Sequence, residues 1–145
     1  METTQSTSKK TKINLDFNDS KYATGRRKTS IAKVWLKKGT GKIYVNGKLF
    51  DQYFVSENHK MQITRPFEII NQATDYDVRC SVTGGGHTGQ AGAMVHGISK
   101  ALVMFDANLK TTLKTENLTT RDPRAVERKK PGRRKARRSF QFSKR

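Results

Sequence analysis

Residues 77–105 read DVRCSVTGGGHTGQAGAMVHGISKALVMF, and this stretch decides which kind of fold the chain can form. Apolar and polar residues alternate over residues 77–83, so Val78, Cys80 and Val82 share one face of a predicted half-buried strand. Cys80 is then a packing residue rather than a reactive one. Over residues 88–105 apolar residues recur at helical spacing, which predicts a helix lying on the sheet. The residues predicted to face the sheet are Ala91, Met94, Val95, Ile98, Ala101, Leu102 and Phe105.

The opposite face of this helix would collect small residues and cations. Its members are Gly89, Ala93, His96, Gly97 and Lys100. Small side chains let a rigid neighbour approach closely, and the cations suit a phosphate backbone, so we expect RNA there. The alternative is an exposed helix that tolerates each glycine at a cost of ~1 kcal/mol. We expect His96 to be a surface hydrogen-bonding residue, because no Asp, Cys or second His is placed to make it a ligand or a base.

The turn between strand and helix, residues 84–89, satisfies the pattern G-x-G-x-x-G of dinucleotide-binding proteins. Such a site also needs a second strand that ends in an acidic residue ~20 positions later, whereas Asp106 stands at the far end of the helix itself. Gln90 and Ala91 occupy the positions where a P-loop requires Lys and Ser or Thr. We therefore expect no cofactor, no small-molecule substrate and no enzyme, and keep a nucleotide-dependent enzyme as the second hypothesis.

The residues before this stretch predict the rest of an α+β domain. Residues 31–36 indicate a strand, and residues 43–45 a second, short strand antiparallel to it. Between them lies a basic loop containing Lys37 and Lys38, for which a phosphate contact is slightly favoured over a role in solubility.

A tight turn and two helices are predicted after these strands. Asn46-Gly47 marks a tight turn, and residues 49–54 fit a short helix. Residues 61–72 fit a second helix, with Pro66 near its start, where proline is tolerated.

The end of the chain concentrates positive charge. From Arg121 onward there are twelve Lys and Arg residues against Asp122 and Glu127, a net charge of +10. With so few aliphatic residues this segment cannot bury enough apolar surface to become ordered alone, so we expect it to be extended until it meets a partner. Phe140 and Phe142 add surfaces for base stacking. The plainer alternative is a solvated tail or a localisation signal.

The bulk composition favours a polyanionic partner. The chain has 145 residues, a net charge of +18 and only 33% hydrophobic residues, so nucleic acid is the first candidate. The sequence contains no run of ~18 apolar residues, so we expect no membrane span. Its first residues lack the apolar region typical of a signal peptide. We expect a flexible extension over residues 1–20, a globular, nucleic-acid-binding α+β domain over residues 21–119 and an extended basic tail over residues 120–145.

Several of these segments resemble the S-nine family of small-subunit ribosomal proteins, in the type found in bacteria and organelles. The matching segments run in family order over about residues 22–145, and the most specific are the glycine-rich turn with its helix and the terminal Ser143-Lys144-Arg145. The others are residues 24–32, 41–47, 52–54, 120–124 and 126–130.

The resemblance implies an α+β fold like the second domain of ribosomal protein S-five, with about four strands, helices behind them and a left-handed crossover. It implies a structural, non-enzymatic protein of the small-subunit head that binds the 3′ major domain of the rRNA. The matching positions give Ser143, Lys144 and Arg145 a contact with the anticodon stem-loop of the P-site tRNA. Neighbouring head proteins would be further partners, in the bacterial cytoplasm or in a mitochondrial or plastid matrix.

The rRNA contacts are expected from the basic segments, the helix face and the tail. They are Arg26, Arg27, Lys28, Lys37, Lys38, Gly89, His96, Lys100, Arg121, Arg124, Arg128, Lys129, Lys130, Arg133, Arg134, Lys135, Arg137 and Arg138. A third hypothesis is a free-standing nucleic-acid or chromatin-binding module, favoured if the protein were abundant outside ribosomal particles.

Overall fold

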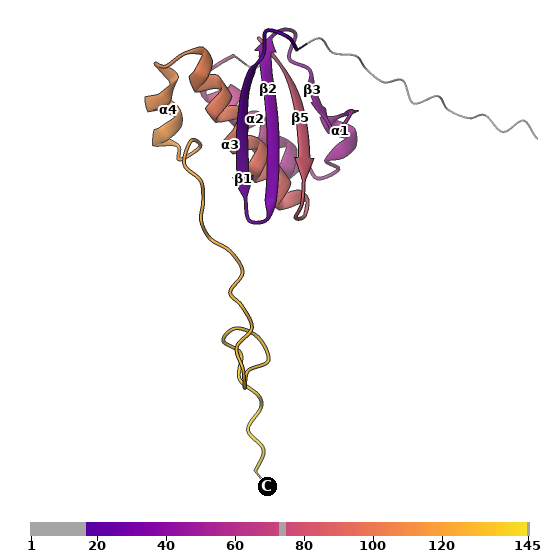
Figure 1. Cartoon of the computed structure of the whole chain (residues 1–145), viewed down its shortest axis with the longest axis vertical. Helices are drawn as coiled ribbons and strands as arrows, with labels where there is room; N and C mark the ends of the chain where they lie inside the picture. The colour runs from indigo at the N-terminus through magenta and orange to yellow at the C-terminus, as the bar shows by residue number, and fades with distance from the viewer. Residues whose placement is uncertain (1–16, 73–74, 145) are drawn as a thin grey trace, which may run out of the picture.

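A five-stranded sheet with helices on one side makes up the folded part of the chain (Figure 1). The computed structural model describes residues 17–72 and 75–144, so the expectation of a flexible extension falls mostly outside the described residues. The elements, in chain order, are β1 Lys21–Arg27, β2 Ser30–Lys38, β3 Ile43–Val45, β4 Lys48–Leu49, α1 Phe50–Tyr53, α2 Glu57–Ile69, β5 Tyr76–Thr83, α3 His87–Phe105 and α4 Leu109–Thr115.

The strands lie in the order β1-β2-β5-β3-β4. β1 pairs with β2, β2 with β5 and β3 with β4, all antiparallel, whereas β3 runs parallel to β5. β3 therefore runs antiparallel to β2, as predicted, but β5 lies between the two strands and they are not paired. In Figure 1 the chain descends β3, returns behind the sheet through α2 and descends β5 on the β2 side, which is a left-handed crossover.

The α+β class is confirmed, and the sheet has five strands rather than about four. β1 was not predicted as a strand, since its inward residues Ala23 and Gly25 are small and the others are mostly polar. The predicted turn at Asn46-Gly47 is confirmed between β3 and β4, with both residues at positive φ. The short helix predicted over residues 49–54 is α1.

The second predicted helix exists as α2, but it begins earlier than expected. Pro66 lies inside α2 rather than near its start, so that expectation is wrong. Because proline has no backbone N–H, the carbonyl of Gln62 loses one helical hydrogen bond there. The proline ring is buried, with Ile63 and Phe67 beside it on the inner side of α2.

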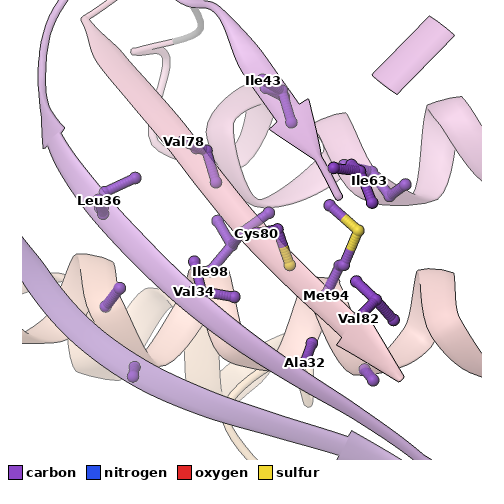
Figure 2. Packing of buried hydrophobic residues seen from close by; sticks show 14 of the residues in the cluster. Ala32, Val34, Leu36, Ile43, Ile63, Val78, Cys80, Val82, Met94 and Ile98 are labelled. Carbon is purple, nitrogen blue, oxygen red and sulfur yellow. The ribbon is translucent and has the colours of Figure 1, made fainter. Parts of the chain in front are cut away.

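The core lies between the sheet and helices α2 and α3. Val78, Cys80 and Val82 of β5 point inward as the alternation predicts, and Figure 2 shows them directed toward Met94 and Ile98 of α3. Ile63 closes the core from α2 (Figure 2). Burial raises the pKa of the Cys80 thiol, which fits the predicted packing role.

α3 and β1 approach each other through glycines. A Cβ on Gly97 would lie 2.6 Å from the Cγ2 atom of Val34, and one on Gly25 would lie 2.9 Å from the Gly97 Cα and would overlap the carbonyl oxygen of Ala93. Gly89, Ala93 and Gly97 are buried. The prediction that they face outward toward RNA is therefore wrong: these small residues admit a neighbouring strand.

Candidate nucleic-acid interface

The base of the tail is tied to the end of β1 by an arginine. The guanidinium of Arg27 forms an ion pair with Asp122 (3.0 Å) and donates a hydrogen bond to the backbone carbonyl of Arg124 (3.2 Å). Arg124 turns back on Asp122 through both its side chain and its backbone N–H. These bonds to Arg124, together with Arg27, hold the pKa of Asp122 well below its usual range. The first residues of the tail are therefore fixed to the end of β1.

His96 and Lys100 of α3 also bind backbone rather than facing solvent freely. The Nδ1 atom of His96 accepts a hydrogen bond from the backbone N–H of Arg26 (3.2 Å), and the Lys100 ammonium donates to the carbonyl of Thr24 (3.1 Å). Burial and then the charge of Lys100 lower the pKa of His96, and the N–H of Arg26, which donates to the unprotonated Nδ1 atom, also favours the neutral imidazole. His96 is therefore a half-buried acceptor that connects α3 to β1, and its imidazole is neutral at pH 7.

A basic cleft that the sequence did not reveal lies beside these residues, between α3 and α4. It has a volume of about 430 Å³, and three lysines line it: Lys100, Lys110 and Lys114. Lys110 and Lys114 are four residues apart in α4, so one face of the helix carries both. The four-residue spacing of the two lysines was the sequence signal that could have located this cleft.

The glycine-rich turn packs on the turn between β1 and β2. Gly84 and Gly85 have positive φ, and a Cβ on either would meet Thr29 or Ser30. The hydroxyl of Ser30, which is buried, donates to the carbonyl of Gly84 (3.0 Å), and a Cβ on Gly89 would lie 2.8 Å from it. Gly89 is therefore buried against Ser30, so the prediction that it lies on an RNA-facing surface is wrong. The close fit to Ser30 accounts for the motif without a phosphate.

The basic loop before β3 is held in shape by an acidic residue of β5. The carboxylate of Asp77 accepts hydrogen bonds from the backbone N–H groups of Thr40 (2.8 Å) and Lys42 (3.0 Å). Burial acts to raise the pKa of Asp77, but these bonds outweigh it and lower the pKa. The ammonium of Lys37 lies 4.9 Å from the centre of the Phe17 ring, and Lys38 is exposed. Lys38 and Lys42 both have exposed side chains in this loop.

The tail leaves the domain beside α4 and runs away from the sheet (Figure 1). Over the described residues up to 144 it contains neither helix nor strand. It makes one local loop, which the guanidinium of Arg137 closes through two hydrogen bonds to Glu127 (2.8 and 3.0 Å). Arg134 lies over the ring of Phe140 (5.6 Å). All of these groups are exposed, so the loop is held only weakly.

Beyond this loop the tail presents isolated side chains to solvent. Phe142 is 87% exposed, and Ser143 and Lys144 are exposed as well. Arg145 lies outside the described residues. A long exposed chain of cations and aromatic rings matches the surface that RNA offers.

Residues 25–145 match the ribosomal protein S9/S16 family. The chain belongs to that family. It is therefore a structural ribosomal protein of the small subunit that acts in translation, with rRNA and ribosomal proteins as its partners. The five-stranded sheet backed by helices agrees with the fold that the resemblance implied. Among the described helices, none has both the length and the apolar character needed to cross a membrane.

The basic side chains predicted to contact rRNA, with His96 among them, fall into two groups. Arg27, Lys37, His96 and Lys100 are partly buried, and the structure ties them to other parts of the domain or to the tail. The rest have exposed side chains: Arg26, Lys28, Lys38, Arg121, Arg124, Arg128, Lys129, Lys130, Arg133, Arg134, Lys135, Arg137 and Arg138. The domain thus uses the first group to set its shape and leaves the second available to a polyanion.

Proposed function

We propose that the chain binds the 3′ major domain of the small-subunit rRNA in the head of the subunit, and that the end of its tail contacts the anticodon stem-loop of the P-site tRNA. One observation carries this proposal: the basic tail is rooted at Asp122 and projects away from the domain with its side chains exposed (Figure 1). Such a tail can reach into a particle much larger than the domain.

The two ends of the tail have different roles in this proposal. The segment up to Arg138 carries most of the cations, which would neutralise rRNA phosphates and release counterions. The last three residues, Ser143, Lys144 and Arg145, follow an exposed Phe142. There the Lys144 ammonium and the planar guanidinium of Arg145 would bind phosphate oxygens of the tRNA.

The exposed cations of the domain form a second contact with rRNA. Arg26 and Lys28 stand at the β1–β2 turn, and Lys110 and Lys114 line the cleft between α3 and α4. The basic turn and the cleft are both near the root of the tail, since Arg26 is bonded to His96 and Arg27 to Asp122. We include Lys110 and Lys114 in the interface and leave out Gly89.

Ribosomes that carry the chain truncated after Phe142 test the tRNA contact. We expect normal subunit assembly, weaker binding of P-site tRNA and more frequent frame errors, because only the three terminal residues are lost. The matched control is Lys135→Gln in the full chain, which removes one exposed tail charge and keeps the terminus. It should lower the salt dependence of rRNA binding by about one phosphate contact and leave tRNA binding unchanged.

Two results would contradict the proposal. If the truncated chain fails to assemble into subunits, the tail end binds rRNA and its tRNA role is secondary. If assembly, tRNA binding and frame maintenance are all unchanged, the role assigned to Ser143, Lys144 and Arg145 is wrong.

A further inference from the structure

The face of the sheet that points away from α2 and α3 is not covered by any described helix (Figure 1). Its residues alternate with the core residues along β1, β2 and β5, as the burial of β2 shows: Ala32 and Val34 are buried, whereas Ile31 and Lys33 are exposed. This open face plays no part in the interface described above. Its composition therefore indicates what it can bind.

An aromatic and cationic row crosses the middle of the open face. Tyr22 of β1 is paired in register with Trp35 of β2, Trp35 with Arg79 of β5, and Arg79 with Tyr44 of β3. The rings of Tyr22 and Trp35 are 5.3 Å apart, and the Arg79 guanidinium lies 5.6 Å from the Trp35 ring. Tyr22 is 44% exposed, so part of its ring is open to a ligand. Tyr22, Trp35 and Arg79 thus line up over three strands, and Tyr44, which is buried, continues the row on β3.

The charge of the strands selects the class of partner. The five described strands contain eight Lys and Arg residues and one acidic residue, Asp77. The Asp77 carboxylate is already engaged by Thr40 and Lys42. Arg79 within the row and Lys33, two residues before Trp35 on β2, both have exposed side chains. The core of a protein interface is depleted of charge, whereas a basic surface with open aromatic rings complements nucleic acid.

We propose that the open face of the sheet, centred on Tyr22, Trp35 and Arg79, is a stacking site for unpaired bases of single-stranded RNA. Stacking needs a base whose face is free, and a duplex offers such faces only at its ends. Tyr22 supplies the exposed ring, Arg79 a guanidinium plane, and Lys33 a charge for the adjoining phosphate. This site deepens the proposed rRNA binding and rests on it.

Trp35 reports directly on this face, because it is the only tryptophan of the chain. The experiment titrates the full-length protein with a labelled, unstructured single-stranded RNA of about ten nucleotides, within the range of such binding sites. Fluorescence anisotropy of the RNA measures binding, and the emission of Trp35 measures stacking. A blunt RNA duplex of the same length and an abasic strand serve as reference ligands. We expect all three to bind, and the single strand with bases to quench Trp35 much more strongly than the abasic strand or the duplex, whose free base faces are only at its ends.

Two substitutions of Tyr22 separate ring stacking from charge. Tyr22→Leu should weaken binding of the single strand roughly five- to hundredfold, the range for loss of one stacked base, without changing its salt dependence. Tyr22→Phe keeps the ring and should bind like the unaltered chain. Lys135→Gln, in the tail, should reduce the salt dependence and leave the quenching of Trp35 intact. Thermal unfolding of each variant checks that the domain is folded.

The possible failures are distinguishable. If RNA binds with the salt dependence expected for phosphate contacts but the emission of Trp35 does not change, the proposed stacking site is wrong. The proposed rRNA binding is not contradicted by that result. If no RNA binds, the proposed function fails as well. If Trp35 responds only when other proteins of the small-subunit head are added, the open face is a protein contact and the inference is overturned. Equal affinities for Tyr22→Leu and Tyr22→Phe would also overturn it.

Discussion

Replacing Gly25 by alanine should push β1 away from α3, because the added methyl group would occupy the same space as backbone atoms of the helix. It would overlap the carbonyl oxygen of Ala93 and the backbone nitrogen of Gly97, and would lie 2.9 Å from the Gly97 Cα. A flexible side chain could rotate away from such a contact, but a helix backbone cannot. The strand or the helix must therefore move as a whole, in the part of the fold that also positions Arg27 and the tail.

The size of the effect follows from two opposing terms. Overpacking a core costs roughly 1–3 kcal/mol and occasionally more, and the rigid backbone on both sides places Gly25→Ala at the upper end. Alanine in a strand regains roughly 0.5–1 kcal/mol relative to glycine. We expect a net loss of stability of about 2–2.5 kcal/mol. At roughly 4–8 °C per kcal/mol for a domain of this size, the midpoint of thermal unfolding should fall by about 8–20 °C.

Gly92→Ala is the matched control, since it adds the same methyl group on α3. There the nearest atom is the Cγ of Arg27 at 3.0 Å, part of a flexible side chain. A gain in helix propensity of about 1 kcal/mol offsets the adjustment of that side chain, so the midpoint should change by only a few degrees. Far-UV circular dichroism and Trp35 emission would follow both variants. Equal midpoints for the two would refute the view that α3 and β1 are in backbone contact.

Three further predictions concern single side chains. Asn46→Ala should cost about 1–3 kcal/mol in urea unfolding, because the amide side chain of Asn46 bonds the backbone N–H and C=O of Val82 (2.9 and 3.0 Å); Asn117→Ala, at a similar φ without such bonds, should cost less. Since folding lowers the pKa of His96 from 6.5, the unfolded chain binds the proton more readily, so stability should fall as the pH drops below about 6.5, and His96→Gln should flatten this slope. Cys80 should resist alkylation at about pH 8 until the domain is unfolded, as measured by mass spectrometry, because burial raises the pKa of its thiol.

The elements that the sequence predicts well are those with a local cause. The period of two over residues 77–83 and the helical period over residues 88–105 fix β5 and α3 almost to the residue. The positive φ of Asn46 and Gly47 is likewise a property of two adjacent residues. In each case the neighbours in sequence carry the whole signal.

The elements that it predicts poorly depend on contacts between distant residues. β1 has almost no hydrophobic period, because α3 lies so close that only Ala23 and Gly25 fit inward. The partner of β3 is β5, some thirty residues later, and no local pattern distinguishes this from pairing with β2. The glycines of α3 would look the same whether they admitted RNA or a strand. Only the position of Gly25 decides between the two.

The candidate interface shows the same division. A run of like charge identifies the tail from composition alone, since nothing in such a segment can form a core. Composition does not distinguish the cations that bind RNA from those that hold the domain together. Arg26 and Arg27 are neighbours in one basic segment, yet the side chain of Arg26 is exposed while that of Arg27 is paired with Asp122. The two arginines differ because residues alternate between the two faces of β1, and because the chain returns to this strand at Asp122, which pairs with Arg27.

That pairing also bears on how a flexible tail can act at a defined place. A tethered charged segment gains affinity from its effective concentration near the site, which depends on where it is rooted and in which direction it starts. Arg27 binds both the Asp122 carboxylate and the Arg124 carbonyl, so position and direction are set together at the end of β1. The same strand carries Tyr22 on the open face and Gly25 against α3. β1, the element with the weakest sequence signal, therefore connects the core, the open face of the sheet and the tail.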